Sequence, residues 1–187
     1  MRYDAGEVIT AMVTPFNEKR DVDYDKVESL AFQLANTGSD AILVTGTTGE
    51  APTLSFDEET EILSSVKRAV NKQAKVIMGT GSNSTETAIK TAKMAEKNEA
   101  DAILSVVPYY NKPSQAGMTE HFSAIAEAVN LPVILYNIPS RTGVNMSVET
   151  VKTLARKYEN IVGIKQSFGD MDAITELKSI CPHDFAL

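Results

Sequence analysis

The sequence predicts an α/β protein with the (β/α)8 or TIM barrel fold, of which about the first six strand–helix units and the start of strand seven are present. Short apolar runs alternate strictly with amphipathic segments of helical period. The expected strands begin at residues 8, 41, 76, 102, 132, 161 and 185, and this spacing of about 30 residues is the length of one strand–helix unit. Such alternation is typical of a parallel sheet covered by helices.

Two parallel-sheet architectures remain at this point, a doubly wound open sheet and a closed barrel. A doubly wound sheet usually carries a glycine-rich turn after its first strand, but Val13–Phe16 contains no glycine. Polar, chemically distinctive residues follow several of the strands instead. This favours the barrel, whose active site lies at the carboxyl ends of its strands.

The expected strands share short apolar runs that are rich in β-branched residues. They cover Val8–Val13, Ala41–Val44, Val76–Met78, Ala102–Val107, Pro132–Ile138 and Ile161–Ile164, and Phe185–Leu187 begins a seventh.

The helices between them are recognised by apolar stripes and by N-terminal signals. Ser55 with Glu58, and Asn83 with Glu86, have the spacing of capping boxes, so a helix is expected to begin at each. The other expected helices cover Asp23–Asn36, Gln115–Val129, Ser147–Tyr158 and Met171–Cys181.

Length and composition limit the classes of protein. A complete barrel typically has about 250 residues, so the 187 residues are expected to form a single barrel domain that is incomplete at its C-terminus. A net charge of −7 without a basic stripe argues against nucleic acid. The sequence has neither a signal peptide nor an apolar run of about 20 residues, which predicts a cytoplasmic protein without a membrane partner. One cysteine and two histidines are too few for a structural zinc site.

Lys165 is the strongest catalytic candidate because it follows the apolar run Ile161–Ile164. Partial burial there would disfavour the ammonium form, and a lysine with a lowered pKa is a nucleophile that forms a Schiff base with a ketone. The alternative is a lysine in a strand that forms a salt bridge.

Two further groups of candidates follow other strands. The turn Gly46–Glu50, with sequence GTTGE, offers backbone N–H groups and two hydroxyls to a carboxylate or phosphate, although an ordinary capped turn remains an equal alternative. Tyr109 and Tyr110 follow strand four, Tyr136 lies near the end of strand five, and Arg141 follows that strand. Together with a lysine they would supply proton transfer and two-point binding of a carboxylate.

These residues occur in motifs that resemble the dihydrodipicolinate synthase and N-acetylneuraminate lyase family of pyruvate-dependent class I aldolases. The resemblance extends from about Val8 to Leu187. The motifs are GTTGE at residues 46–50, PYYN at 108–111, YNIPSRTG at 136–143 and GIK at 163–165.

The resemblance implies a lyase of lysine and diaminopimelate biosynthesis that condenses pyruvate with L-aspartate 4-semialdehyde to give 4-hydroxy-tetrahydrodipicolinate. It implies that the reaction needs no cofactor or metal. It implies a dimer or homotetramer in which Tyr110 reaches into a neighbouring subunit. The resemblance further implies that Lys165 forms the Schiff base and that Tyr136, Thr47 and Tyr110 form a proton relay. Thr48, with the backbone of Gly46 and Gly49, would bind the pyruvate carboxylate. Arg141 would bind the carboxylate of the aldehyde.

The sequence departs from the synthase pattern at a few positions. Gln166 follows the lysine where synthases usually have glutamate, and this resembles the lyase branch, whereas Arg141 resembles the synthase branch. Phe56 and Glu59 stand where lysine-inhibited synthases tend to carry histidines, while Asn83 and Tyr109 match them. The alternatives are therefore another aldolase or lyase of the family, such as one that cleaves N-acetylneuraminate or a 2-keto-3-deoxy acid, or a non-catalytic fragment.

Overall fold

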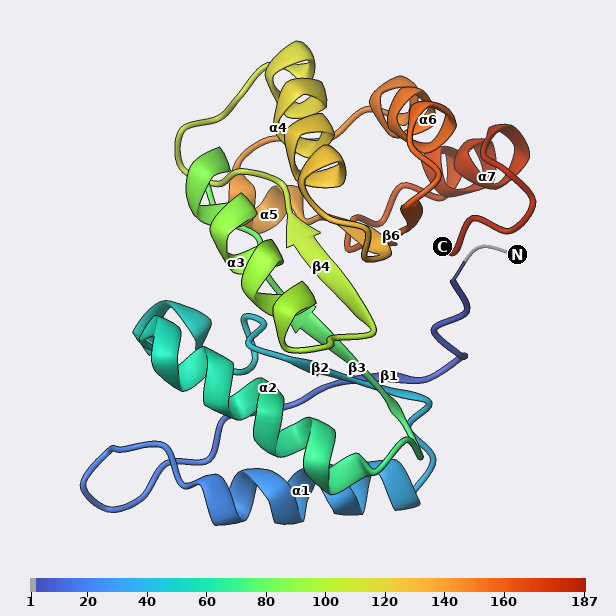
Figure 1. The fold of residues 1–187 in the computed structure, drawn as a ribbon. Helices are drawn as coiled ribbons and strands as arrows, with labels where there is room; N and C mark the ends of the chain where they lie inside the picture. The colour runs from blue at the N-terminus through green and yellow to red at the C-terminus, as the bar shows by residue number, and fades with distance from the viewer. Residues whose placement is uncertain (1–2) are drawn as a thin grey trace. The chain divides into compact units, whose positions relative to one another are not determined.

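The structure, a computed structural model, describes residues 3–187 and contains six strand–helix units in the expected order (Figure 1). The strands are β1 (Ile9–Ala11), β2 (Ala41–Val44), β3 (Lys75–Gly79), β4 (Ala102–Val106), β5 (Val133–Asn137) and β6 (Ile161–Gln166). The long helices are α1 (Tyr24–Asn36), α2 (Phe56–Val70), α3 (Thr85–Lys97), α4 (Gln115–Ala128), α6 (Val148–Lys157) and α7 (Met171–Ile180). Two short helices, η1 (Ala51–Thr53) and α5 (Pro139–Thr142), were not expected from the sequence.

The chain divides into two compact units. The N-terminal unit comprises Ala5–Gly79 and Met94–Ala102, and the C-terminal unit comprises Thr80–Lys93, Ile103–Leu187 and the described residues up to Asp4. Each unit contains consecutive parallel strands, which agrees with the predicted fold class. The predicted assignment of residues 1–187 to a single domain stays a prediction.

In the N-terminal unit β1 pairs with β2 and β2 with β3, all in parallel. The strand β2 is buried throughout, as expected for a strand with a helix layer on its face. The helices α1 and α2 lie side by side in this unit (Figure 1). They bury Val27, Ala31, Leu63 and Val66, which are spaced along one stripe of each helix.

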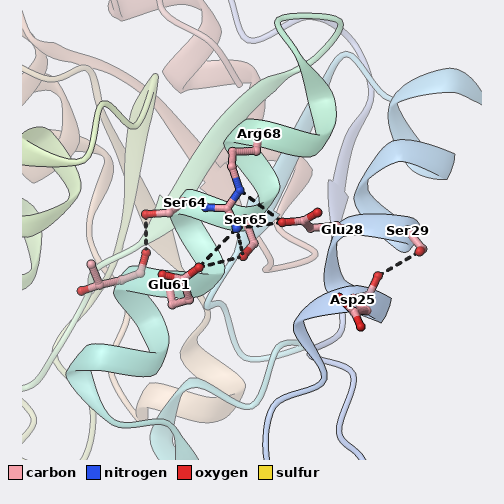
Figure 2. A network of polar contacts seen from close by, with 8 residues as sticks. Asp25, Glu28, Ser29, Glu61, Ser64, Ser65 and Arg68 are labelled. Carbon is pink, nitrogen blue, oxygen red and sulfur yellow. Dashed lines mark hydrogen bonds and ion pairs between the residues drawn. The ribbon is translucent and has the colours of Figure 1, made fainter.

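A charged network joins the exposed sides of these two helices (Figure 2). Arg68 on α2 donates to Glu28 on α1 at 2.7 Å and to Glu61, two turns earlier on its own helix, at 3.2 Å. The side chains are about half exposed, and exposed ion pairs contribute little to stability. The network is therefore expected to contribute little to the stability of the unit.

The observed helix starts test the two predicted capping boxes. The box at Ser55 is confirmed, since Ser55 accepts from the Glu58 N–H and the Glu58 carboxylate accepts from the Ser55 N–H. The box at Asn83 is wrong, because α3 begins at Thr85 and the Ser84 hydroxyl accepts from the Thr87 N–H. Serine competes well with asparagine as an N-cap, so the helix begins one residue later.

In the C-terminal unit β4 pairs with β5 and β5 with β6, again in parallel. Ala186 forms an isolated parallel bridge to Gly163, which agrees with the predicted start of a seventh strand. A Cβ on residue 163 would lie 2.8 Å from the Ala186 carbonyl oxygen, so only glycine permits this approach.

The pairing of β5 with β6 contains one irregularity that matters for the site. Val133 is opposite Ile161, but Ile134 is opposite Gly163, so Val162 is an extra residue in β6. From that point on, Tyr136 is opposite Lys165 and Asn137 is opposite Gln166. Without the bulge Tyr136 would be opposite Ile164, and Lys165 would face the other side of the sheet.

Among residues 3–187, no helix is both long and apolar enough to span a membrane.

Candidate active site

The best-defined part of the candidate site is the pair Tyr136 and Lys165 at the carboxyl ends of β5 and β6. Paired positions on neighbouring strands direct their side chains to the same face of the sheet. The Lys165 Nζ accordingly lies 4.4 Å from the centre of the Tyr136 ring. The Tyr136 ring and the Lys165 amine are thus neighbours, while the catalytic roles expected for them stay predictions.

The predicted partial burial of Lys165 is wrong for this structure, since its side chain is exposed. The four preceding residues of β6 are buried, but Lys165 is the fifth of six and lies where the strand leaves the core. Within the C-terminal unit, Lys165 contacts the Tyr136 ring. A cation–π contact of this kind contributes about 0.5–1 kcal/mol at exposed sites.

Arg141 lies on α5, the short helix that directly follows β5. Gly143 ends this helix with a φ of 74°, and its N–H donates to the Pro139 carbonyl at 2.9 Å. Glycine adopts this left-handed conformation without a steric penalty. The guanidinium of Arg141 is exposed, and no hydrogen bond to it is found among residues 3–187.

Four residues before Arg141 in the chain lies a buried amide that sequence reasoning missed. Asn137 is fully buried and bonds through its side chain to Asn145, Met146 and Gln166. Its position in the YNIPSRTG motif was visible in the sequence, but its partners belong to two separate segments. Only the folded chain shows that this asparagine connects them.

Tyr110 lies after β4 in a strained turn. Its φ is 73°, and the Asn111 N–H donates to the Tyr109 carbonyl at 2.9 Å. A hydrogen bond across a residue with this positive φ defines the rare form of γ-turn, which costs about 1–3 kcal/mol. The Asn111 amide donates to the Asn83 carbonyl at 3.0 Å and anchors the turn. The Tyr110 side chain is 90% exposed.

The GTTGE turn belongs to the N-terminal unit. The N–H groups of Gly49 and Glu50 donate to the carbonyls of Gly46 and Thr47, which closes the turn. Thr47 and Thr48 are exposed, and among the described residues their N–H groups make no backbone hydrogen bond. The turn therefore offers two hydroxyls and two N–H groups, a set suited to a carboxylate.

Two other titratable residues are perturbed by burial. Burial raises the pKa of Glu59, at the start of α2, to about 7. Burial lowers the pKa of His121, on α4, to about 4. The His121 Nδ1 lies 2.8 Å from the Thr85 hydroxyl, and Nε2 is buried without a hydrogen-bond partner among the described residues.

Consecutive parallel strand–helix units, with a lysine beside a tyrosine at the ends of adjacent strands, are typical of a class of protein, the (β/α) barrels. Comparison with known proteins specifies the family. The sequence model of the Dihydrodipicolinate synthetase family matches residues 4–187, and the chain belongs to this family.

Similar proteins include the 4-hydroxy-tetrahydrodipicolinate synthase of a Synechococcus species, which is 52% identical over 97% of this chain and 59% of its own length. A crystal structure of DHDPS from Cyanidioschyzon merolae with lysine bound is 50% identical with a TM-score of 0.96, over 98% of this chain and 62% of that one. The dihydrodipicolinate synthase of Acinetobacter baumannii, solved in complex with pyruvate, is 44% identical with a TM-score of 0.90, over 95% of this chain and 62% of that one.

The chain thus spans about three fifths of the length of these relatives. The agreement in fold over nearly all of this chain confirms the predicted barrel class.

Proposed function

We propose that the protein containing this chain is a lyase with 4-hydroxy-tetrahydrodipicolinate synthase activity, which condenses pyruvate with L-aspartate 4-semialdehyde in lysine and diaminopimelate biosynthesis. The observation that carries the proposal is the Lys165 amine 4.4 Å from the Tyr136 ring at the ends of paired strands. Membership of the family supports it. A role in amino-acid biosynthesis fits a cytoplasmic location, which forms part of the proposal.

The reaction follows from the chemistry of an imine. The neutral Lys165 amine attacks the pyruvate C2 carbonyl, and water leaves as the imine forms. Loss of a C3 proton gives an enamine, whose C3 forms a bond to the aldehyde carbon. The amine of the aspartate semialdehyde then attacks C2, which closes the ring and breaks the bond to Lys165.

The remaining candidate residues have proposed roles in proton transfer and binding. Tyr136 would relay protons to and from the carbinolamine and imine together with Thr47 and Tyr110. Thr48 and the backbone of the turn from Gly46 to Gly49 would bind the pyruvate carboxylate. Arg141 would bind the carboxylate of the aldehyde through two parallel hydrogen bonds.

We further propose that the protein acts as a dimer or tetramer in which Tyr110 enters the site of a neighbouring copy. The support is its exposure combined with backbone strain, because a strained residue persists where the surrounding structure holds it for a function. A large aromatic side chain that is 90% exposed is also well suited to an interface.

The proposal is tested by incubating the chain with pyruvate and borohydride and mapping the reduced adduct by peptide mass. We expect one adduct, on Lys165, and none in Lys165→Ala. Lys152 provides a matched control, since its amine is held by the Glu149 carboxylate at 2.9 Å and Lys152→Ala should label normally. Labelling at other lysines, or undiminished labelling of Lys165→Ala, would refute the assignment.

Arg141→Ala is expected to raise the KM for aspartate semialdehyde at least 10-fold and to change the KM for pyruvate less than about twofold. The physical reason is the loss of a charge-assisted, two-point hydrogen bond, worth about 1.5–3 kcal/mol. Steady-state kinetics with each substrate varied in turn measures both constants. Equal effects would show that Arg141 supports the structure only. Cleavage of a 2-keto-3-deoxy acid without any condensation would instead favour the lyase alternative.

A further inference from the structure

We propose that Asn137 and Gln166 form a positioning pair that holds the Arg141-bearing segment, residues 138–147, in register with the Lys165 strand. The inference rests on the proposed function, because Arg141 is taken to bind the aldehyde substrate. It assigns a role to two residues that touch neither substrate, and it explains what the amide next to Lys165 does.

The Asn137 side chain has all its hydrogen-bonding groups engaged. Its Oδ1 accepts from the Met146 N–H at 3.1 Å, and its Nδ2 donates to Asn145 Oδ1 at 2.7 Å and to Gln166 Oε1 at 3.0 Å. Asn137 is fully buried, so each of these bonds replaces one to water, and a lost partner is costly. The result is a rigid three-way junction.

The orientation of this junction follows from the Met146 N–H, which can only donate. The Asn137 oxygen must therefore face Met146, and its NH2 group must face Asn145 and Gln166. Both of these partners must in turn present oxygen atoms. Gln166 satisfies this requirement with its amide oxygen, and a glutamate carboxylate would satisfy it equally well.

The junction lies directly behind the reactive pair. Tyr136 is opposite Lys165, and the next paired positions are Asn137 and Gln166, whose side chains point to the other face of the sheet. One pair thus presents the amine and the phenol, while the following pair ties β6 to the segment that carries Arg141.

The position of Arg141 depends on this segment because its guanidinium makes no hydrogen bond within residues 3–187. Asn137 fixes the end of the segment at Met146. A second anchor comes from α4, where Gln115 donates to the Asn145 carbonyl at 2.8 Å and accepts from the Ser147 N–H at 3.0 Å. Without the Asn137 junction, the Gln115 hydrogen bonds would be the remaining side-chain anchor between this segment and α4.

The test compares four variants of the chain. Asn137→Leu and Gln166→Leu remove the junction, Gln166→Glu retains the required oxygen, and Asn160→Leu is the matched control. Asn160 also makes side-chain hydrogen bonds in the C-terminal unit, to the carbonyls of Ala126, Val129 and Leu131, which all lie outside residues 138–147.

Two measurements are made on each variant. Hydrogen exchange followed by mass spectrometry reports the protection of residues 138–147 and needs no substrate. Pyruvate with succinic semialdehyde, followed by borohydride, reports single-turnover condensation on Lys165. This aldehyde retains the carboxylate but lacks the amine that would expel the lysine. Borohydride therefore reduces the condensation product while it is still linked to Lys165 as an imine, and mass spectrometry measures the adduct.

We expect exchange in residues 138–147 to accelerate at least 10-fold in both leucine variants at the junction, and the half-saturating aldehyde concentration to rise at least 10-fold. The half-saturating pyruvate concentration should change less than twofold. In Gln166→Glu and Asn160→Leu, the exchange rate of residues 138–147 and the half-saturating aldehyde concentration should match those of the parent.

Unchanged exchange in Gln166→Leu would overturn the proposal, as would an equal loss with pyruvate and aldehyde. The same exchange increase in Asn160→Leu would show a general loss of stability instead of positioning. A protein containing the parent chain that forms no Lys165 adduct would refute the proposed function, while the exchange comparison would still decide whether the junction holds the segment.

Discussion

Tyr136→Phe is expected to lower turnover about 10²-fold or more while the fold and most of the pyruvate affinity are retained. Phenylalanine keeps the ring against which the Lys165 Nζ lies at 4.4 Å, so the cation–π contact survives and only the hydroxyl is lost. A positioned acid–base group typically contributes about 10²–10⁴-fold. The effect should therefore appear in kcat.

The measurement is steady-state kinetics, together with the rate of borohydride-trappable adduct formation on Lys165. Tyr110→Phe should show a similar loss if its hydroxyl belongs to the same relay. Tyr158→Phe is a suitable control, since its hydroxyl donates to Glu127 at 2.5 Å on the helix layer. A loss below about threefold in both Tyr136→Phe and Tyr110→Phe would leave the relay without support.

Acidification from pH 6.5 to about pH 4 is expected to destabilise the C-terminal unit by up to about 3 kcal/mol through His121 alone. Burial lowers the pKa of His121 from 6.5 to about 4, and each pKa unit corresponds to about 1.4 kcal/mol. Above pH 6.5 the imidazole is neutral in both states. Below that pH the unfolded chain binds the proton first, so folding loses free energy until the folded state is protonated as well.

His121→Asn separates this contribution from the titration of other groups. Asparagine offers Thr85 a hydrogen-bonding group near the position of Nδ1, which lies 2.8 Å from the Thr85 hydroxyl, but it does not titrate. Urea unfolding at pH 7.5, 6, 5 and 4.5 measures the free energy of unfolding of both proteins. The parent should lose stability relative to the variant as the pH falls. A difference between them that stays constant with pH would contradict the prediction.

The sequence alone predicted the order of the elements and most of their bounds to within two residues. These features are local, because apolar periodicity identifies β2 and α2 and the Ser55–Glu58 box marks a helix start from four consecutive residues. The motifs with Lys165, Tyr136 and Arg141 were likewise visible in short stretches of sequence. The same local reasoning erred at Asn83, where the adjacent Ser84 is an equally good cap.

Only the tertiary structure decided how those residues meet. The extra residue Val162 in β6 places Lys165 opposite Tyr136, and no periodicity in the sequence shows it, because a bulge depends on the partner strand. The positive φ of Tyr110 and the three-way junction at Asn137 likewise depend on hydrogen bonds to Asn83, Met146 and Gln166. Helix caps and apolar stripes arise from neighbours along the chain, whereas register, strain and buried amide networks arise from segments that come together on folding.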